Sequence, residues 1–409
     1  MKKLALVLAL ALLVCVNANA EEKYVAGGFE ASGHLNAGFG YQYFGKNDAT
    51  YNNGGLASLV RDNWSNFKIT PRNNQFNFIL DEVQIDLSKT FGENIRFRAD
   101  LAFGDSSIGS MMNGINIKQA YATANIAVGN GIELLFGRFA APIGYESINR
   151  NENNTITRSA LYNFGIRPWT YTGFKVYYPF TDSFDWHIYA VNNMLDGALG
   201  TKVPTAGTSV AAYNMNSDNV ILPTFGTRLG YTWGEEGKES TVGLSGVFGA
   251  NQRTDAGDYS KWGHWTYLAD LDWNIYATDA FSIGGEGIYR QDGGNKEGTG
   301  SQKAKFMGAI LDLNYAFSDV WDGTLKYALL WQNDYTNAGA MTIATNTTRG
   351  AYAPQNVGKG YFNEIGLCGG YQITDGAKFK AEYRLDWTKY SNFSKSLAHT
   401  VVGQLEYAF

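Results

Sequence analysis

A period of two residues in the distribution of apolar side chains is the feature that most constrains the fold of this chain. From Phe29 to Tyr43, every second residue is apolar or small, and the residues between them are mostly polar or glycine. Because successive side chains of a β-strand point to opposite faces, this segment has one apolar and one polar face. The sequence contains about sixteen such segments, which start near residues 28, 75, 95, 117, 132, 171, 184, 224, 241, 265, 281, 305, 321, 361, 377 and 397.

The connections between these segments alternate in length. Short ones such as 129–131 and 181–183 follow even-numbered segments, and long ones such as 45–74 and 142–169 follow odd-numbered segments. Short turns at one end and long loops at the other are typical of outer-membrane barrels. We therefore predict an all-β fold, a transmembrane antiparallel up-and-down β-barrel of about sixteen strands with short periplasmic turns and long extracellular loops.

The second segment departs from the simple alternation. Its apolar positions include Phe78 and Leu80 and then shift by one residue to Val83 and Ile85. One extra residue in a strand produces such a shift, so we predict a β-bulge near Asp81.

Aromatic residues at the ends of the apolar faces favour a membrane barrel over a soluble β-sandwich, whose strands also alternate. The ten residues from Trp321 to Trp331 span about 33 Å of strand, which a tilt of about 40° projects to roughly 25 Å, the height of an apolar band. No charged residue falls on these faces in the clear segments, and an Arg or Lys at the bilayer centre would cost about 2–4 kcal/mol. We predict a membrane girdle formed by Trp186, Trp233, Trp265, Trp273, Trp321, Trp331 and Trp387.

The amino terminus has the features of an export signal. Two lysines precede an apolar stretch from Leu4 to Val16, and Ala18-Asn19-Ala20 is a small-x-small cleavage pattern. We predict a signal peptide over 1–20 and a barrel domain over 21–409, located in the outer membrane of a Gram-negative cell.

Charge and cysteine content exclude several classes of function. Without Lys2 and Lys3, 31 of the 33 basic residues remain against 38 acidic ones, and this net charge of −7 argues against nucleic-acid binding. The predicted mature chain keeps one cysteine, Cys368, so no intrachain disulfide is possible. No Cys/His spacing indicates a metal site, and no histidine has a Ser or Asp at a catalytic spacing. We expect no catalytic residue, no enzyme activity, no cofactor and no metal.

Two segments between Asn74 and Asp196 carry a family resemblance: Phe78 to Leu87 and Phe136 to Glu146. Tyr171-Thr172-Gly173 and Val191-Asn192-Asn193 follow at suitable distances. The stretch, roughly a third of the chain, resembles the OmpL-like outer-membrane β-barrel porin family. The resemblance implies a porin and supplies no known solute.

A barrel of about sixteen strands leaves an aqueous channel rather than a filled interior. We therefore expect passive diffusion of small hydrophilic solutes and ions, with weak selectivity, through a homotrimer in outer-membrane lipid. A solute-specific channel, for phosphate or another small anion, and a structural or adhesive barrel are the alternatives. The carboxy-terminal Phe409 resembles the signal that the outer-membrane assembly machinery recognises, and that machinery is an expected partner.

The third long loop, 142–169, is the best candidate for a constriction of the channel. If it folds inward, Glu146 and Glu152 would face arginines across the opening; the alternatives are ordinary solvated loop charges or a structural pair between Arg138 and Glu146. The pattern leaves the facing of the segment around Arg138 ambiguous. The candidate constriction residues are Arg138, Glu146, Arg150, Glu152, Arg158 and Arg167.

The polar faces of the strands supply a second set of candidates, the wall of the channel. These side chains either form salt bridges with one another that keep a wide wall solvated or provide a path for anions. Acidic residues among them argue against a strong anion preference. The candidates are Arg96, Arg98, Asp100, Glu286, Arg290, Lys378, Lys380, Glu382, Arg384 and Asp386.

Overall fold

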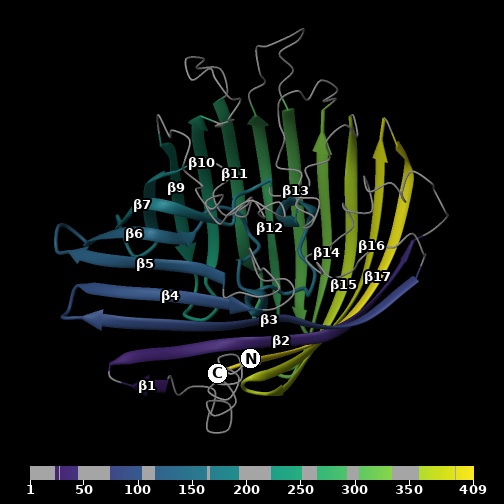
Figure 1. Cartoon of the computed structure of the whole chain (residues 1–409), viewed down its shortest axis with the longest axis horizontal. Coiled ribbons are helices and arrows are strands. Elements are labelled where there is room, and N and C mark those ends of the chain that lie inside the picture. The colour runs from purple at the N-terminus through teal and green to yellow at the C-terminus, as the bar shows by residue number, and fades with distance from the viewer. Residues whose placement is uncertain are drawn as a thin grey trace, which may run out of the picture.

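Sixteen long antiparallel strands, β2 to β17, form one closed barrel in the computed structural model of this chain (Figure 1). Each strand pairs with the next along the chain, and β17 pairs with β2 to close the sheet. The predicted barrel of about sixteen strands is confirmed. The structure describes residues 24–26, 28–44, 74–103, 116–163, 166–192, 223–250, 265–292, 304–333, 359–391 and 393–409, so the predicted signal peptide lies outside the described residues.

The first eight long strands are β2 (Phe29–Phe44), β3 (Asn74–Phe91), β4 (Ile95–Phe103), β5 (Asn116–Ile126), β6 (Ile132–Ala140), β7 (Thr170–Pro179), β8 (Phe184–Val191) and β9 (Thr224–Trp233). The other eight are β10 (Ser240–Ala250), β11 (Trp265–Tyr276), β12 (Phe281–Asp292), β13 (Ala304–Ala316), β14 (Trp321–Gln332), β15 (Gly360–Thr374), β16 (Ala377–Tyr390) and β17 (Phe393–Ala408). All but the last begin within one residue of the predicted starts, and β17 begins four residues earlier than predicted. A short strand, β1 (Tyr24–Ala26), pairs with β2.

Two β-bulges place an extra polar residue on the inner face of the barrel. The register between β2 and β3 shifts by one residue, which leaves Asp81 as the extra residue and confirms the predicted bulge. The register between β4 and β5 shifts in the same way at Lys118, which the sequence did not indicate. Both side chains are buried, as expected when a bulge re-aims a side chain into the interior.

The two faces of the barrel wall have the opposite character to those of a soluble domain. Leu325 and Tyr383 are exposed, whereas Glu286 and Lys326, on the other face, are 0% exposed. A soluble domain usually hides its apolar side chains and exposes its charges. An apolar outer face around a charged inner face is the arrangement that a barrel in lipid requires.

Apart from Trp265, the tryptophans of the predicted girdle lie on the outward, apolar face. Those near the short turns are Trp186, Trp233, Trp273 and Trp321, and those near the long loops are Trp265, Trp331 and Trp387. The side chain of Trp265 lies outside the described part of the structure. Their role at the membrane surface stays a prediction.

The carboxy terminus is part of the closure of the barrel. The Phe409 N–H donates to the carbonyl of Gly33 in β2 at 3.0 Å, and the Gly33 N–H donates to the Phe409 carbonyl at 2.8 Å. The last residue therefore continues the pairing of β17 with β2. Its role as an assembly signal stays a prediction.

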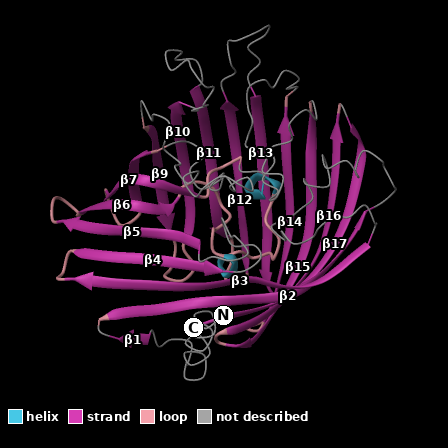
Figure 2. Ribbon diagram, viewed as in Figure 1, coloured by secondary structure: helices cyan, strands magenta, loops and turns pink. Residues whose placement is uncertain are grey.

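The connection between β6 and β7 contains two short helical segments, η1 (Arg150–Glu152) and α3 (Ala160–Asn163), which lie within the outline of the barrel (Figure 2). Within the described residues, no helical segment has the length and apolar character needed to cross a bilayer.

Candidate functional site

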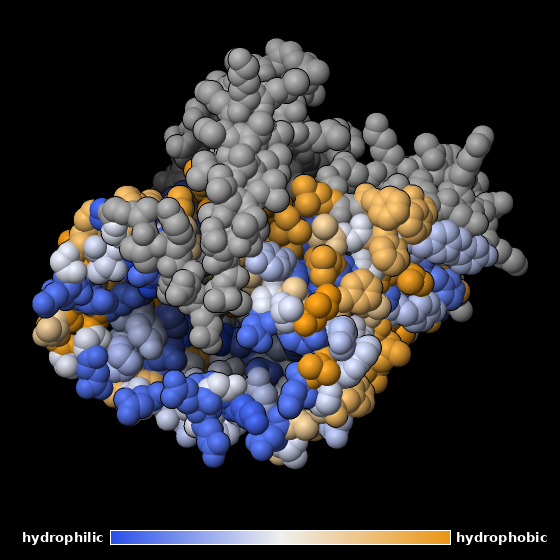
Figure 3. All heavy atoms as spheres, turned by 90° about the horizontal axis from the view of Figure 1, so that it is seen from below, coloured by the Kyte–Doolittle hydropathy of each residue, from blue (hydrophilic) through white to orange (hydrophobic). Residues whose placement is uncertain are grey.

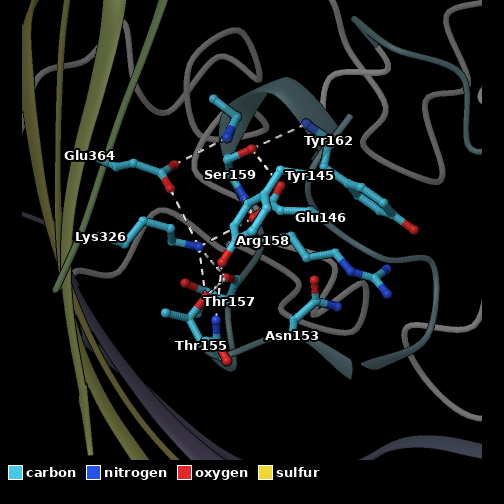
Figure 4. A network of polar contacts seen from close by, with 12 residues as sticks. Tyr145, Glu146, Asn153, Thr155, Thr157, Arg158, Ser159, Tyr162, Lys326 and Glu364 are labelled. Carbon is cyan, nitrogen blue, oxygen red and sulfur yellow. Dashed lines mark hydrogen bonds and ion pairs between the residues drawn. The ribbon is translucent and has the colours of Figure 1, made fainter. Parts of the chain in front are cut away.

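The described residues 141–163 and 166–169, here called the inner loop, lie inside the barrel against the inward face of the wall. Its hydrogen bonds and ion pairs reach side chains of β3, β10, β11, β12, β14, β15 and β16. Figure 4 shows the central part of this contact, where Lys326 and Glu364 extend from the wall toward the loop. The loop therefore runs along a large part of the inner circumference.

Wall carboxylates accept hydrogen bonds from the backbone of the inner loop. Glu382 of β16 accepts from the Ile156 N–H at 2.7 Å, from the Thr157 N–H at 2.9 Å and from the Thr157 hydroxyl at 2.5 Å. Buried backbone N–H groups of a segment without regular structure need partners, because an unpaired buried group costs free energy. Three more wall acids accept hydrogen bonds from backbone N–H groups of the loop: Asp270 from Gly144, Glu286 from Tyr145 and Glu364 from Ala160.

Wall cations complement them by donating to the carbonyl oxygens of the loop. Lys326 Nζ lies 2.5 Å from the Thr157 carbonyl and 2.9 Å from the Thr155 hydroxyl (Figure 4). The other donors to loop carbonyls are Arg290 to Ile166, Lys380 to Asn153 and Arg384 to Arg158. The charges of this part of the wall thus hold the loop, in addition to pairing with one another.

Two glycines of the wall form sockets for side chains of the inner loop. A Cβ added to Gly284 of β12 would lie 2.3 Å from the ring of Tyr145, and one added to Gly308 of β13 would lie 2.1 Å from Leu161 Cδ2. The loop can approach the wall this closely only because these two positions carry no side chain.

Gly144 is required by both its conformation and its surroundings. Its φ of +80° falls in the left-handed region that favours glycine. A Cβ at this position would lie 2.5 Å from the Glu286 carboxylate and 2.7 Å from Arg167. Gly144, within the segment Phe136 to Glu146 that carries the family resemblance, therefore shapes the entry of the chain into the barrel.

The arginines of the inner loop are buried and hold the loop together. Arg167 donates to the carbonyls of Ile143 and Glu146, Arg158 to that of Ile148 and Arg150 to that of Ile156. Arg150 Nε also lies 3.4 Å from the bulge residue Asp81, and this ion pair attaches the loop to β3.

Glu146 is buried at the centre of the same network. It accepts from the Ser159 N–H at 2.8 Å and from the Ser159 hydroxyl at 2.6 Å, and its carboxylate lies 3.4 Å from Lys326 Nζ. Burial acts to raise the pKa of Glu146, but Lys326 and the Ser159 hydrogen bonds outweigh it and lower the pKa below its usual value. Glu146 is therefore an ionised anchor of the loop at neutral pH.

These placements revise the predicted constriction residues. The inner loop does fold into the barrel, but Glu146, Arg150, Arg158 and Arg167 are buried within its anchorage and do not line an opening. Glu152 is exposed, together with Asn151 and Asn154. The predicted pairing of glutamates with arginines across an opening is wrong for these buried residues.

Arg138 does not belong to the interior. It is paired with Thr172 of β7, on the same face of β6 as Phe136, which is 71% exposed. Phe139, on the opposite face, is buried in the interior. Arg138 therefore faces outward, which resolves the ambiguity of this segment and removes Arg138 from the candidate constriction residues. Its position near the extracellular end of β6 keeps the cost of an outward charge small.

Some inward side chains of β4 to β9 face the remaining lumen, whereas Phe139, Tyr171 and Tyr189 belong to a buried cluster that also contains Ile143 and Leu161 of the inner loop. Arg96 is exposed and donates to Ser88, and Arg98 is partly exposed and pairs with Asp100 at 2.7 Å. Seen from below, the molecule has a hollow bordered mainly by hydrophilic side chains, with hydrophobic ones along the outer wall (Figure 3). Other half-buried side chains on this part of the wall are Tyr121, Glu133, Lys175, Tyr177, Asp185, His187 and Arg228.

The wall candidates all lie on the inward face, but they divide into two groups. Arg96 and Arg98 belong to the part that faces the lumen, and Asp100, which is buried, pairs with Arg98. Glu286, Arg290, Lys380, Glu382 and Arg384 contact the inner loop. Lys378 pairs with Asp322 at 2.6 Å, and Asp386 pairs with Arg384 at 2.8 Å.

Sequence reasoning missed the lumen-facing residues of β7 to β9, such as Lys175 and His187. Their strands alternate clearly, so the inward positions could have been listed, but only the position of the loop shows which of them stay accessible. Within the described residues, no group of three or more His, Cys, Asp or Glu side chains is arranged to hold a metal ion.

Comparisons with known proteins agree with this architecture. A family model described as "Putative beta-barrel porin-2, OmpL-like" matches residues 28–405. No curated protein matches the sequence. Among solved structures, the outer membrane channel DcaP of Acinetobacter baumannii is similar at 12% identity with a TM-score of 0.60, over 95% of this chain and 99% of that one.

Two further structures show the same fold. The anion-selective porin from Comamonas acidovorans is 12% identical with a TM-score of 0.54, over 93% of this chain and 99% of that one. The outer membrane protein OmpT of Vibrio cholerae is 10% identical with a TM-score of 0.53, over 95% of this chain and 100% of that one.

Proposed function

Because this chain belongs to the OmpL-like β-barrel porin family, we propose that it forms a water-filled channel for passive diffusion of small hydrophilic solutes and ions. Sixteen strands enclose more space than their own side chains fill. The charged inward face supports an aqueous lumen, and the apolar outward face supports a place in the outer membrane. A channel of this kind performs no catalytic step.

The inner loop sets the narrowest part of this channel. The observation that carries the proposal is the attachment of the loop to β11, β12 and β14 to β16 through both backbone donors and acceptors. A loop held at so many points occupies the side of the lumen next to these strands, so solutes do not pass there. Ions then pass between the exposed edge of the loop, at Asn151, Glu152 and Asn154, and the inward side chains of β4 to β9.

Selectivity between cations and anions is weak in this proposal. Charges of both signs face the passage, and most of them neutralise each other in close pairs. Arg98 pairs with Asp100 at 2.7 Å. Arg228 pairs with Asp272 in the same way.

The remaining assignments concern assembly in the cell. We propose export by the signal peptide over 1–20, insertion guided by Phe409, and a homotrimer. The outward face of β4 and β5 supports the trimer, because its alanines would allow another barrel to approach closely: Ala99, Ala120, Ala122 and Ala124. Native mass spectrometry of detergent-solubilised protein should show three copies, and a monomer at all concentrations would exclude this assembly.

Conductance in planar lipid bilayers tests the channel itself. The mature chain, folded in detergent, should give stepwise increases of current that rise linearly with voltage and with salt concentration. Folding should be established first by the β-sheet circular dichroism spectrum. A correctly folded protein that never conducts would refute the channel and favour a structural or adhesive barrel.

A further inference from the structure

Lys175 of β7 differs from the other lysines of the inner wall. Among the described residues its ammonium forms neither an ion pair within 4 Å nor a hydrogen bond; its close contact is with the Phe139 ring, 5.6 Å from the ring centre, and Glu133 and Asp185 act on it from a longer distance. By contrast, the inward lysines 118, 326, 378 and 380 each lie within 4 Å of a carboxylate. Lys175 is therefore a cation whose charge the described protein groups leave without a close partner.

The position of Lys175 makes this charge accessible from the lumen. Cross-strand pairing with Leu135 and Tyr189, both buried in the interior, places it on the inward face. Its side chain is half-buried and lies on the part of the wall that the inner loop leaves uncovered. A solute moving along the passage would meet this ammonium.

Aromatic rings surround Lys175 on both sides along the strands. Toward the extracellular end, Phe139 and Tyr171 pack with ring centres 6.5 Å apart. Toward the periplasmic end, Tyr177 and His187 are 4.8 Å apart. Rings offer flat apolar surface beside the charge, which suits the body of an organic solute.

We infer that Lys175 and its aromatic neighbours form a binding subsite for small organic carboxylates with an apolar body. The inference rests on the proposed channel function and names a solute class for one part of that channel. The carboxylate would accept hydrogen bonds from the Lys175 ammonium, which is the stronger, charge-assisted kind. The apolar body would lie against the ring of Tyr177, which is half-buried, whereas Phe139 is buried behind the Lys175 side chain.

The acidic groups on the neighbouring strands limit which carboxylates the subsite can bind. Glu133 of β6 is paired with Tyr177, at the periplasmic side of Lys175. Asp185 of β8 lies 3.2 Å from His187. A solute with a second negative charge would be repelled there, so monocarboxylates are favoured over dicarboxylates.

Block of single-channel current by benzoate tests the subsite. In the full-length mature protein, benzoate at millimolar concentration should reduce the current, and acetate, which has almost no apolar body, should do so much less. Lys175→Met keeps the length of the side chain and removes its charge, so it should weaken the block by benzoate about tenfold, which corresponds to about 1.4 kcal/mol. Lys378→Met, at an inward lysine already paired with Asp322, is the matched control and should keep the wild-type block.

The outcomes separate this inference from the channel itself. If folded wild-type protein does not conduct, the proposed function fails before the subsite is tested. If it conducts and benzoate blocks Lys175→Met as well as wild type, or acetate blocks as well as benzoate, the subsite is wrong while the channel stands. Tyr177→Leu, which removes a ring and no charge, should also weaken the block by benzoate, and a block as strong as in the wild type would remove Tyr177 from the subsite.

Discussion

Removal of the Glu382 carboxylate should release part of the inner loop and change the current through the channel. The three hydrogen bonds that Glu382 accepts join it to Ile156 and Thr157, at distances of 2.5 to 2.9 Å. A hydrogen bond to a charged group contributes about 1.5–3 kcal/mol, so the gross contribution of the three is about 4–9 kcal/mol. Water in the lumen can replace part of these hydrogen bonds. We therefore expect Glu382→Ala to lower the free energy of loop attachment by about 3–5 kcal/mol.

Such a loss shifts the equilibrium between the attached and the detached loop by about two to four orders of magnitude, since 1.4 kcal/mol corresponds to a factor of ten. In planar bilayers, the variant should show larger current noise and additional conductance levels, with the closure of the barrel unchanged. Asp322→Asn is the control, because Asp322 is a wall carboxylate that pairs with Lys378 and has no recorded contact with the loop among the described residues. A Glu382→Ala channel with wild-type conductance and noise would refute the reasoning.

Three further predictions follow from the placement of single residues. Gly308→Leu should displace Leu161 from its socket and alter the conductance, at a cost of about 1–3 kcal/mol for overpacking. Gly246→Leu is the control and should leave the conductance unchanged, because an added Cβ there meets no atom within 4 Å. Equal conductance in both variants would argue against the socket. Arg138→Ala should leave the reversal potential in a salt gradient unaltered, because Arg138 faces outward; a shift toward cation selectivity would place it in the lumen. Glu152→Lys should raise the relative permeability of anions, since Glu152 is exposed on the edge of the inner loop, and an unchanged reversal potential would remove it from the passage.

The barrel could be predicted from the sequence because the alternation of apolar and polar residues is visible within each strand. A strand with one side in lipid and one in water must alternate, so each segment reveals its own faces without reference to the others. The bulge at Asp81 was predictable for the same reason, since an extra residue shifts the phase of the pattern. Lys118 gave a weaker signal, because the outward positions that follow it are the small residues Ala120, Ala122 and Ala124.

The candidate site was less predictable because its contacts are not local. Glu382 and Ile156 are separated by 226 residues, and no sequence pattern indicates that they meet. Arginines in a loop are usually solvated. Arg158 is buried because the loop packs against the barrel wall, and the sequence around Arg158 does not indicate this contact. The direction of Arg138 was ambiguous because Gly137, with its φ of +134°, interrupts the apolar pattern of β6.

Covalent modification of single cysteines tests most directly the claim that solutes pass between the inner loop and the wall of β4 to β9. In a Cys368→Ser background, Glu152→Cys lies on the loop edge and Tyr121→Cys on the uncovered wall. Val402→Cys lies behind the loop, where Val402 is buried against Ile156. A bulky water-soluble thiol reagent should lower the single-channel conductance of the first two and leave that of Val402→Cys unchanged. Loss of conductance at Val402→Cys alone would contradict the account, because the passage would then run behind the loop.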